Sequence, residues 1–119
     1  MCIRDRGYTV QGWLLSPLRA DPKVKAPMIV SVHGGPSAAN TPRFMEHGAA
    51  TETLDAGYHM FLPNPRGSYG QGEAFTAANK RDFGGGDLRD ILAGVDAVEK
   101  VAPVAVSYTH LTLPTNREV

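Results

Sequence analysis

The apolar residues of this 119-residue chain fall into short runs separated by glycine, proline and polar clusters. Residues 7–15 alternate between apolar and polar positions, a pattern that predicts a strand with one buried face. Residues 28–32 and 58–62 are almost continuously apolar, which is typical of strands buried on both faces of a parallel sheet. Residues 16–27 contain three prolines and several charges, so we expect a surface connection there.

Three further segments favour helix. Residues 43–56 end at Gly57, where a helix C′ residue with positive φ is expected. Residues 73–79 can form a short helix. The clearest helix spans residues 87–101, and its apolar positions form one stripe at helical spacing: Leu88, Ile91, Leu92, Val95 and Val98.

This stripe and Trp13 are predicted to belong to the core. Asp87 and Asp90 lie at the start of the last helix, where carboxylates favour the macrodipole and cap free amides. The predicted order is strand, strand, helix, strand, helix, helix. It contains a strand-helix-strand crossover, which implies a parallel sheet, so the predicted fold class is α/β.

Composition limits the classes of partner. The chain is 42% hydrophobic and 20% charged, and its formal net charge is zero. Nucleic acids and anionic membranes both select a basic excess, so neither is expected as a partner. No apolar run approaches the roughly 20 residues of a membrane span.

The two ends of the chain resemble translated sequencing adapters. The mosaic end of a transposon-based sequencing library encodes Met-Cys-Ile-Arg-Asp-Arg, and its reverse strand with the following primer encodes residues 106–115. We therefore expect residues 1–6 and 105–119 to be adapter-derived and residues 7–104 to be natural. The only cysteine, Cys2, lies in the first of these ends, so no disulfide within the chain is predicted.

The most informative motif is His33-Gly34-Gly35-Pro36, directly after the buried strand 28–32. Glycines at the carboxyl end of such a strand allow tight turning and close approach of a ligand. Backbone amides there can face a developing oxyanion, as in the His-Gly-Gly loops of lipases and esterases. A simple Gly-Pro turn with a locally packed histidine is the alternative.

The second motif is the loop of residues 63–72. Its glycine spacing is not that of a dinucleotide site, and it has no Walker lysine, so phosphate binding is not expected. Arg66 is predicted to bond neighbouring carbonyls or acids, with a substrate carboxylate as the alternative. The loop residues of interest, predicted to be structural or substrate-facing, are Asn64, Arg66, Gly67, Ser68 and Tyr69.

Taken in order, these motifs resemble the start of the catalytic domain of the prolyl oligopeptidase family, especially its acylaminoacyl-peptidase-like and dipeptidyl-peptidase-like branches. The matching pieces are Gly12-Trp13-Leu14, His33-Gly34-Gly35-Pro36, Ala56-Gly57-Tyr58, Pro63-Asn64-Pro65-Arg66-Gly67-Ser68 with Tyr69-Gly70, and Phe83-Gly84-Gly85 before Asp87 and Asp90. The resemblance covers nearly all of residues 7–104.

The resemblance implies an α/β-hydrolase fold, here incomplete, and a Ser-Asp-His triad that cleaves short peptides without a cofactor. It places the triad beyond the end of the chain, so no catalytic residue is expected here and the fragment itself is expected to be inactive. It also implies that His33, Gly34 and Gly35 form the oxyanion-hole region. A carboxylesterase of the same fold and a non-catalytic binding fragment are the alternatives.

No metal site is predicted, because His47 and His59 lack ligand spacing with each other or with acids. The carboxylates Asp82, Asp87, Asp90 and Asp96 are assigned to capping and solvation and not to a catalytic pair. A fragment with an uncovered sheet edge is expected to be partly molten or to aggregate. The sequence gives no prediction of oligomeric state or of localisation.

Overall fold

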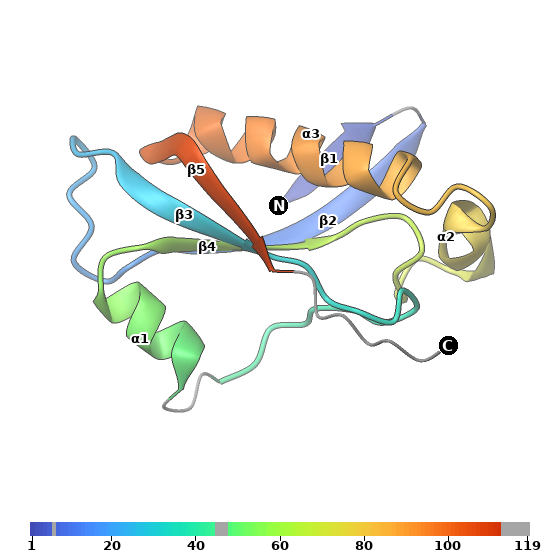
Figure 1. Cartoon of the computed structure of the whole chain (residues 1–119), viewed down its shortest axis with the longest axis horizontal. Helices are drawn as coiled ribbons and strands as arrows, with labels where there is room; N and C mark the ends of the chain where they lie inside the picture. The colour runs from blue at the N-terminus through green and yellow to red at the C-terminus, as the bar shows by residue number, and fades with distance from the viewer. Residues whose placement is uncertain (6, 45–47, 113–119) are drawn as a thin grey trace.

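The computed structural model describes residues 1–5, 7–44 and 48–112. Within them, a five-stranded sheet has the strand order β1-β2-β4-β3-β5 (Figure 1). The strands are β1 (Cys2–Asp5), β2 (Tyr8–Leu15), β3 (Ala26–Ser31), β4 (His59–Asn64) and β5 (Val104–Thr112). The helices are α1 (Ala49–Asp55), α2 (Glu73–Thr76), followed by the 3-10 turn Ala77–Asn79, and α3 (Gly86–Val101).

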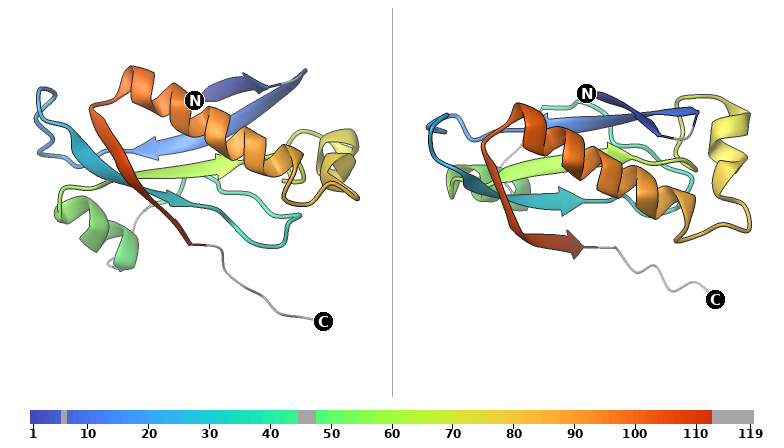
Figure 2. Two further views of the ribbon diagram at one scale, coloured as in Figure 1. Left: turned by 45° about the horizontal axis from the view of Figure 1, so that its top comes forward. Right: turned by 90° about the horizontal axis from the view of Figure 1, so that it is seen from above.

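The sheet is mixed. β3 runs parallel to β4 and to β5, whereas β2 pairs antiparallel with β1 and with β4. The chain passes from β3 to β4 through α1, so the predicted crossover and the α/β class are confirmed. α1 and α3 lie on opposite faces of the sheet, and α3 crosses over several strands (Figures 1 and 2).

The core lies between α3 and the sheet. Val10, Val30, Phe61 and Val98 are fully buried in it. α3 approaches β4 closely at Gly94, where a Cβ atom would lie 2.7 Å from the Phe61 ring. A glycine at this position therefore sets the distance between the helix and the sheet.

Two core predictions are wrong in part. Val98 and its neighbours Ile91 and Val95 are buried, but Leu88 and Leu92 are 41% and 55% exposed. The buried face of α3 is rotated toward Gly94, which leaves the two leucines at its margin. Trp13 is 36% exposed, because it occupies one of the outward positions of β2.

The first helix is shorter than predicted. α1 begins at Ala49, whereas the prediction began at residue 43. The predicted helical residue Met45 and the histidine His47 lie outside the described residues. The predicted helix end is confirmed, because Gly57 has φ of +89° and donates its amide to the Leu54 carbonyl.

Two strands were not predicted, and both lie in or reach into the ends of the chain. β1 pairs with β2, where Ile3 faces Val10, and Ile3 joins the core. β5 begins opposite β3, where Val104 faces Ala26. The adapter origin of these ends stays a prediction.

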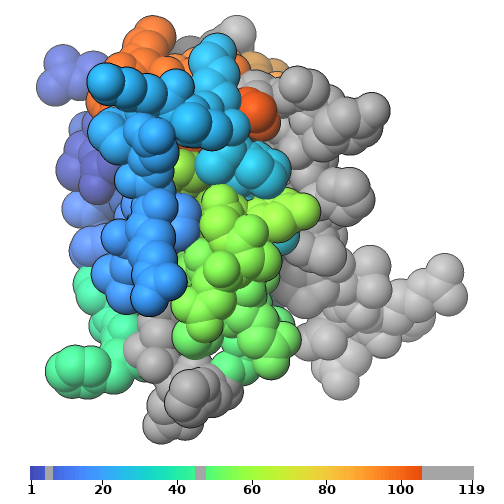
Figure 3. Space-filling view, turned by 90° about the vertical axis from the view of Figure 1, so that its left-hand side faces the viewer, coloured from blue at the N-terminus to red at the C-terminus, as the bar shows by residue number. Residues whose placement is uncertain are grey.

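The connection 16–25 lies beside the end of α1, at the end of the sheet opposite the motif loops (Figure 3). No helix of the described residues is long and apolar enough to cross a membrane.

Candidate functional site

The two motif loops meet at the carboxyl ends of the parallel strands β3 and β4 (Figure 1). Residues 33–40 follow β3, and residues 65–72 follow β4. The loops are joined directly, because the Tyr69 amide donates to the Ala38 carbonyl at 2.8 Å. The carboxyl edge of parallel strands is the usual place for a site in α/β folds.

The ring of His33 connects the loops at their base. Its Nδ1 lies 3.0 Å from the Gly34 carbonyl oxygen, and its Nε2 lies 2.8 Å from Ser68 Oγ. A carbonyl only accepts, so Nδ1 carries the proton. In the neutral ring, Nε2 then accepts a hydrogen bond from the Ser68 hydroxyl. Both nitrogens are therefore used within the fold.

This serine–histidine pair has the spacing of a nucleophile and its base, but not the exposure. Ser68 is only 1% exposed, so a substrate carbonyl cannot reach its hydroxyl. His33 Nδ1 bonds a backbone carbonyl, whereas a catalytic histidine is oriented by a carboxylate. The pair is a structural link between the two loops.

Gly35 has a backbone that other residues rarely adopt. Its φ is +134°, and a Cβ atom would lie 3.0 Å from the Ser37 nitrogen. In the part of the chain that the structure describes, the amides of Gly34 and Gly35 donate to no protein acceptor. They are therefore free to bind an external anion or carbonyl oxygen.

Arg66 is bound within the fold and does not face solvent. Its Nε donates to Asp90 Oδ2 at 2.8 Å, and its second terminal nitrogen donates to Asp90 Oδ1 at 2.6 Å. Its guanidinium lies 4.7 Å from the centroid of the Tyr8 ring. The arginine thus bonds an acid, as expected. The capping or solvation role expected for Asp90 is wrong, because Asp90 is fully buried in this pair.

The remaining predicted loop residues divide into buried and exposed. Asn64 is 6% exposed, and its side chain bonds the backbone of Asn40 at 2.7 and 2.8 Å. Gly67 turns the loop with φ of +102° and donates to the Phe75 carbonyl at 2.9 Å. Tyr69 is 57% exposed beside the first loop, so it is the member of this set placed to meet a ligand.

Asn40 was not among the residues predicted from the sequence to belong to the site. Its backbone and side chain bond Asn64, Pro63 and Trp13, and those partners belong to two different strands. The signal available in the sequence was a polar residue at the end of the His33–Asn40 loop. Only the folded sheet brings its partners, 23 to 27 residues away, into reach.

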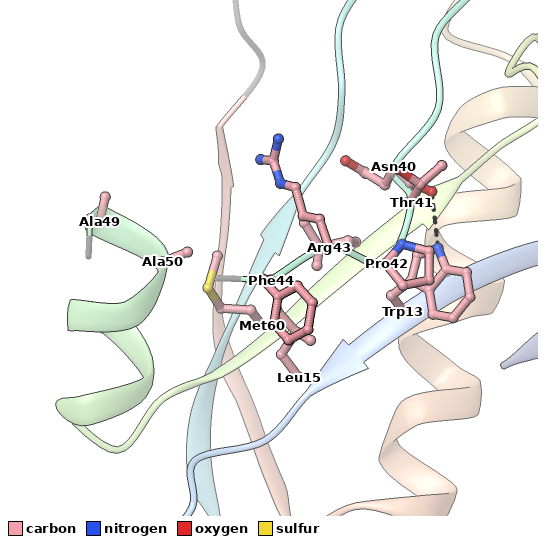
Figure 4. Close-up of a pocket in the computed structure, with 12 residues that line it drawn as sticks. Trp13, Leu15, Asn40, Thr41, Pro42, Arg43, Phe44, Ala49, Ala50 and Met60 are labelled. Carbon is pink, nitrogen blue, oxygen red and sulfur yellow. Dashed lines mark hydrogen bonds between the residues drawn. The ribbon is translucent and has the colours of Figure 1, made fainter. Parts of the chain in front are cut away.

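A separate cavity of about 630 Å³ lies on the α1 face of the sheet (Figure 4). Its walls are mainly apolar and include Leu15, Phe44 and Met60. Asn40, the last residue of the first motif loop, also lines this cavity, whereas His33 and Gly35 do not. Among the described residues, no group of three or more histidine, cysteine or acidic side chains could hold a metal ion.

His59 is a second buried histidine, on β4. It is 1% exposed, and its Nδ1 lies 3.1 Å from Ser16 Oγ. Its Nε2 is buried and has no hydrogen-bond partner. Burial removes solvation from the charged ring and lowers the pKa of His59 below its usual 6.5.

Comparisons with known proteins agree on one family. The model of the prolyl oligopeptidase family matches residues 43–107. An uncharacterized peptidase, YuxL, of Bacillus subtilis is 35% identical over 100 residues, which are 83% of this chain and 15% of that protein. A probable dipeptidyl-peptidase 5 of Aspergillus terreus is 32% identical over 100 residues, which are 83% of this chain and 14% of that protein.

Solved structures give the same result. The uncomplexed acylaminoacyl peptidase of Pyrococcus horikoshii superposes with a TM-score of 0.79 and 28% identity, over 93% of this chain and 18% of that one. An acylaminoacyl peptidase in complex with Z-Gly-Gly-Phe-chloromethyl ketone superposes with a TM-score of 0.81 and 27% identity, with the same coverage. The chain thus spans about one seventh of the length of the curated relatives named above.

Proposed function

The chain belongs to the prolyl oligopeptidase family, and from that membership we propose that its full-length protein is a serine peptidase acting through an acyl-enzyme. The chain has part of an α/β-hydrolase fold. In this proposal residues 7–104 are the first part of the catalytic domain.

The observation that carries the proposal is the pair of unpartnered amides at Gly34 and Gly35. They lie at the carboxyl end of β3, in a loop fixed by its neighbours, and they are directed to no acceptor in the described fold. Acyl transfer places a negative charge on the former carbonyl oxygen of the substrate. Preorganised amides stabilise that charge, and the loss of one donor lowers the rate by about 10²–10³.

His33 has a supporting role in this mechanism. Both of its ring nitrogens are engaged, with Gly34 and Ser68, so the ring itself is not a donor for the oxyanion. The ring instead fixes the position of Gly34 against the second loop. The histidine of the motif therefore acts through the backbone amides beside it.

Ser, His and Asp of the triad are assigned to the remainder of the full-length protein. Within the described residues, the serine–histidine pairs Ser68–His33 and Ser16–His59 each have a buried member, and neither histidine bonds a carboxylate. The 119 residues alone are therefore proposed to be inactive. The mechanism uses side chains and backbone amides, so it requires no cofactor.

The proposed substrates are short peptides. The relatives of known description are dipeptidyl-peptidases and acylaminoacyl peptidases, and one similar structure carries Z-Gly-Gly-Phe-chloromethyl ketone, a blocked tripeptide derivative. Exposed Tyr69 lies at the rim of the loops, where a peptide backbone would pass. Neither a nucleic acid nor a membrane is part of this proposal.

The test uses the intact gene, cloned across both ends of this reading frame. The purified full-length protein should react stoichiometrically with a fluorophosphonate and should hydrolyse dipeptidyl and acylaminoacyl anilides. The isolated 119-residue chain, prepared in parallel, should do neither. A full-length protein that reacts with no fluorophosphonate would refute the peptidase assignment, and one that cleaves only esters would replace it with a carboxylesterase.

A further inference from the structure

The far end of the 33–40 loop is held by a second set of bonds, centred on Asn40. The Asn40 amide donates to Asn64 Oδ1 at 2.7 Å, and Asn64 Nδ2 donates back to the Asn40 carbonyl at 2.8 Å. The same carbonyl accepts the indole N–H of Trp13 at 3.0 Å, the bond drawn in Figure 4. Asn40 Nδ2 donates to the Pro63 carbonyl at 3.3 Å. We call Asn40, Asn64 and Trp13 the asparagine clamp.

The clamp is tied to the rigid part of the fold. Asn64 is the last residue of β4, a strand paired on both sides, and its side chain is 6% exposed. A buried amide needs partners for both its oxygen and its nitrogen, and Asn64 finds both on the backbone of one residue. Asn40 is thereby held in register with the sheet, as a further strand residue would be.

The clamp completes the restraint of the loop that carries the free amides. His33 is fixed at the start by its bond to Ser68, and Ala38 is fixed by the Tyr69 amide. Without the clamp, the loop would be held at His33 and by the single bond to the Ala38 carbonyl, and it would continue freely beyond Ala38. A segment fixed at both ends samples fewer conformations, so its amides keep one orientation.

We propose that the asparagine clamp positions the Gly34 and Gly35 amides for oxyanion stabilisation, although its residues lie outside the His33-Gly34-Gly35-Pro36 motif. This inference rests on the proposed function. Asn40, Asn64 and Trp13 are positioning residues, because they act through the loop and their bonds go to backbone groups of the fold. Displacement of a catalytic group by about 1 Å can cost about 10²-fold in rate, so a remote restraint has a measurable effect.

The decisive variant is Asn64→Leu in the full-length protein, because leucine has the same number of side-chain heavy atoms with the same branching and makes no hydrogen bonds. We expect kcat for a peptide anilide to fall about 10- to 100-fold, with KM within about threefold of the wild-type value. Affinity for a peptidyl aldehyde, whose enzyme adduct places an oxyanion on the same amides, should fall by the same factor as kcat. If Asn64 contributed only to stability, neither kcat nor the affinity for the aldehyde would change.

Graded variants separate the bonds from the packing. Asn64→Asp keeps the acceptor for the Asn40 amide and should recover part of kcat. Trp13→Phe removes only one donor and keeps an aromatic ring, so its loss should stay below about tenfold. Val98→Ala, at a fully buried position of α3, should lower thermal stability and leave kcat unchanged.

The outcomes distinguish the two proposals. A wild-type protein without fluorophosphonate reactivity or anilide hydrolysis would refute the proposed function and this inference with it. An active wild-type protein whose Asn64→Leu variant keeps its kcat and its aldehyde affinity would refute the clamp alone. Equal losses in Asn64→Leu and Val98→Ala would also refute it, because the effect would then follow stability.

Discussion

The guanidinium of Arg66 and the carboxylate of Asp90 form a buried ion pair with two parallel hydrogen bonds. The backbone amide of Arg66 donates a third bond to Asp90 Oδ2 at 2.8 Å. Asp90 lies in the second turn of α3, and Arg66 follows β4, so the pair joins the second motif loop to the helix. Bidentate arginine–carboxylate pairs fix geometry as well as energy.

Asp90→Ala in the full-length protein should destabilise this region strongly. The substitution removes the carboxylate that the buried guanidinium and the backbone amide of Arg66 share, a loss of about 3–5 kcal/mol for a buried pair. Hydrogen exchange of peptides covering α3 measures the local opening free energy. Asp96→Ala, which removes an exposed carboxylate from the same helix, should change it by less than about 0.5 kcal/mol.

A double variant tests the mechanism of that loss. Replacing both partners, as in Arg66→Met with Asp90→Leu, removes the buried positive charge together with its carboxylate and should recover much of the stability. If the double variant were as unstable as Asp90→Ala, the loss would come from changed packing and not from the buried charge.

The elements that the sequence predicted well are those defined by local pattern. β2, β3 and β4 follow from alternation and apolar runs, and α3 follows from its stripe. The exposed Leu88 and Leu92 show the limit of such patterns, because they locate an apolar face only to within about one helical position.

What the sequence did not predict depends on partners far along the chain. Asp90 and Arg66 are 24 residues apart, and His33 and Ser68 are 35 apart. An aspartate near a helix start looks like a cap until the fold places an arginine beside it. The two motif loops were identified, but the bonds that link them exist only once β3 and β4 are paired.

His59 predicts a loss of stability in acid. Its pKa in the folded protein is lowered by burial from the usual 6.5, so below about pH 6.5 the unfolded chain binds the proton more readily. The contribution of neutral His59 to stability is therefore complete above that pH and falls as the pH drops toward the folded-state pKa. Unfolding of the full-length protein in urea at about pH 7.5 and about pH 5.5 measures the change.

The matched variant for this prediction is His59→Gln, which keeps a polar group near Ser16 and does not titrate. It should be less stable than wild type at the higher pH, and the difference should shrink at the lower pH. If the difference in stability were the same at both pH values, His59 would have the same pKa in the folded and unfolded states, and the prediction would be wrong.

Gly35→Ala should impair the proposed oxyanion site. Alanine disfavours φ of +134°, and its Cβ would lie 3.0 Å from the Ser37 nitrogen and 3.3 Å from Ala38 Cβ. The loop must shift, and kcat of the full-length protein should fall about 10²–10³-fold. Gly57→Ala places alanine at another residue of positive φ, +89°, in open space beyond α1. It should cost about 1 kcal/mol of stability and leave kcat unchanged, so equal losses would refute the assignment.

The isolated 119-residue chain should behave as a loosely packed species. Several large apolar side chains are more than half exposed: Leu18, Phe44, Phe83, Leu92 and Val101. Together with the edge strands β1 and β5, they give the chain surface that a stable monomer usually covers. We expect strong binding of a hydrophobic dye, a broad thermal transition and concentration-dependent association. The full-length protein, measured alongside, should bind little dye, and a sharp two-state melt of the isolated monomer would contradict the prediction.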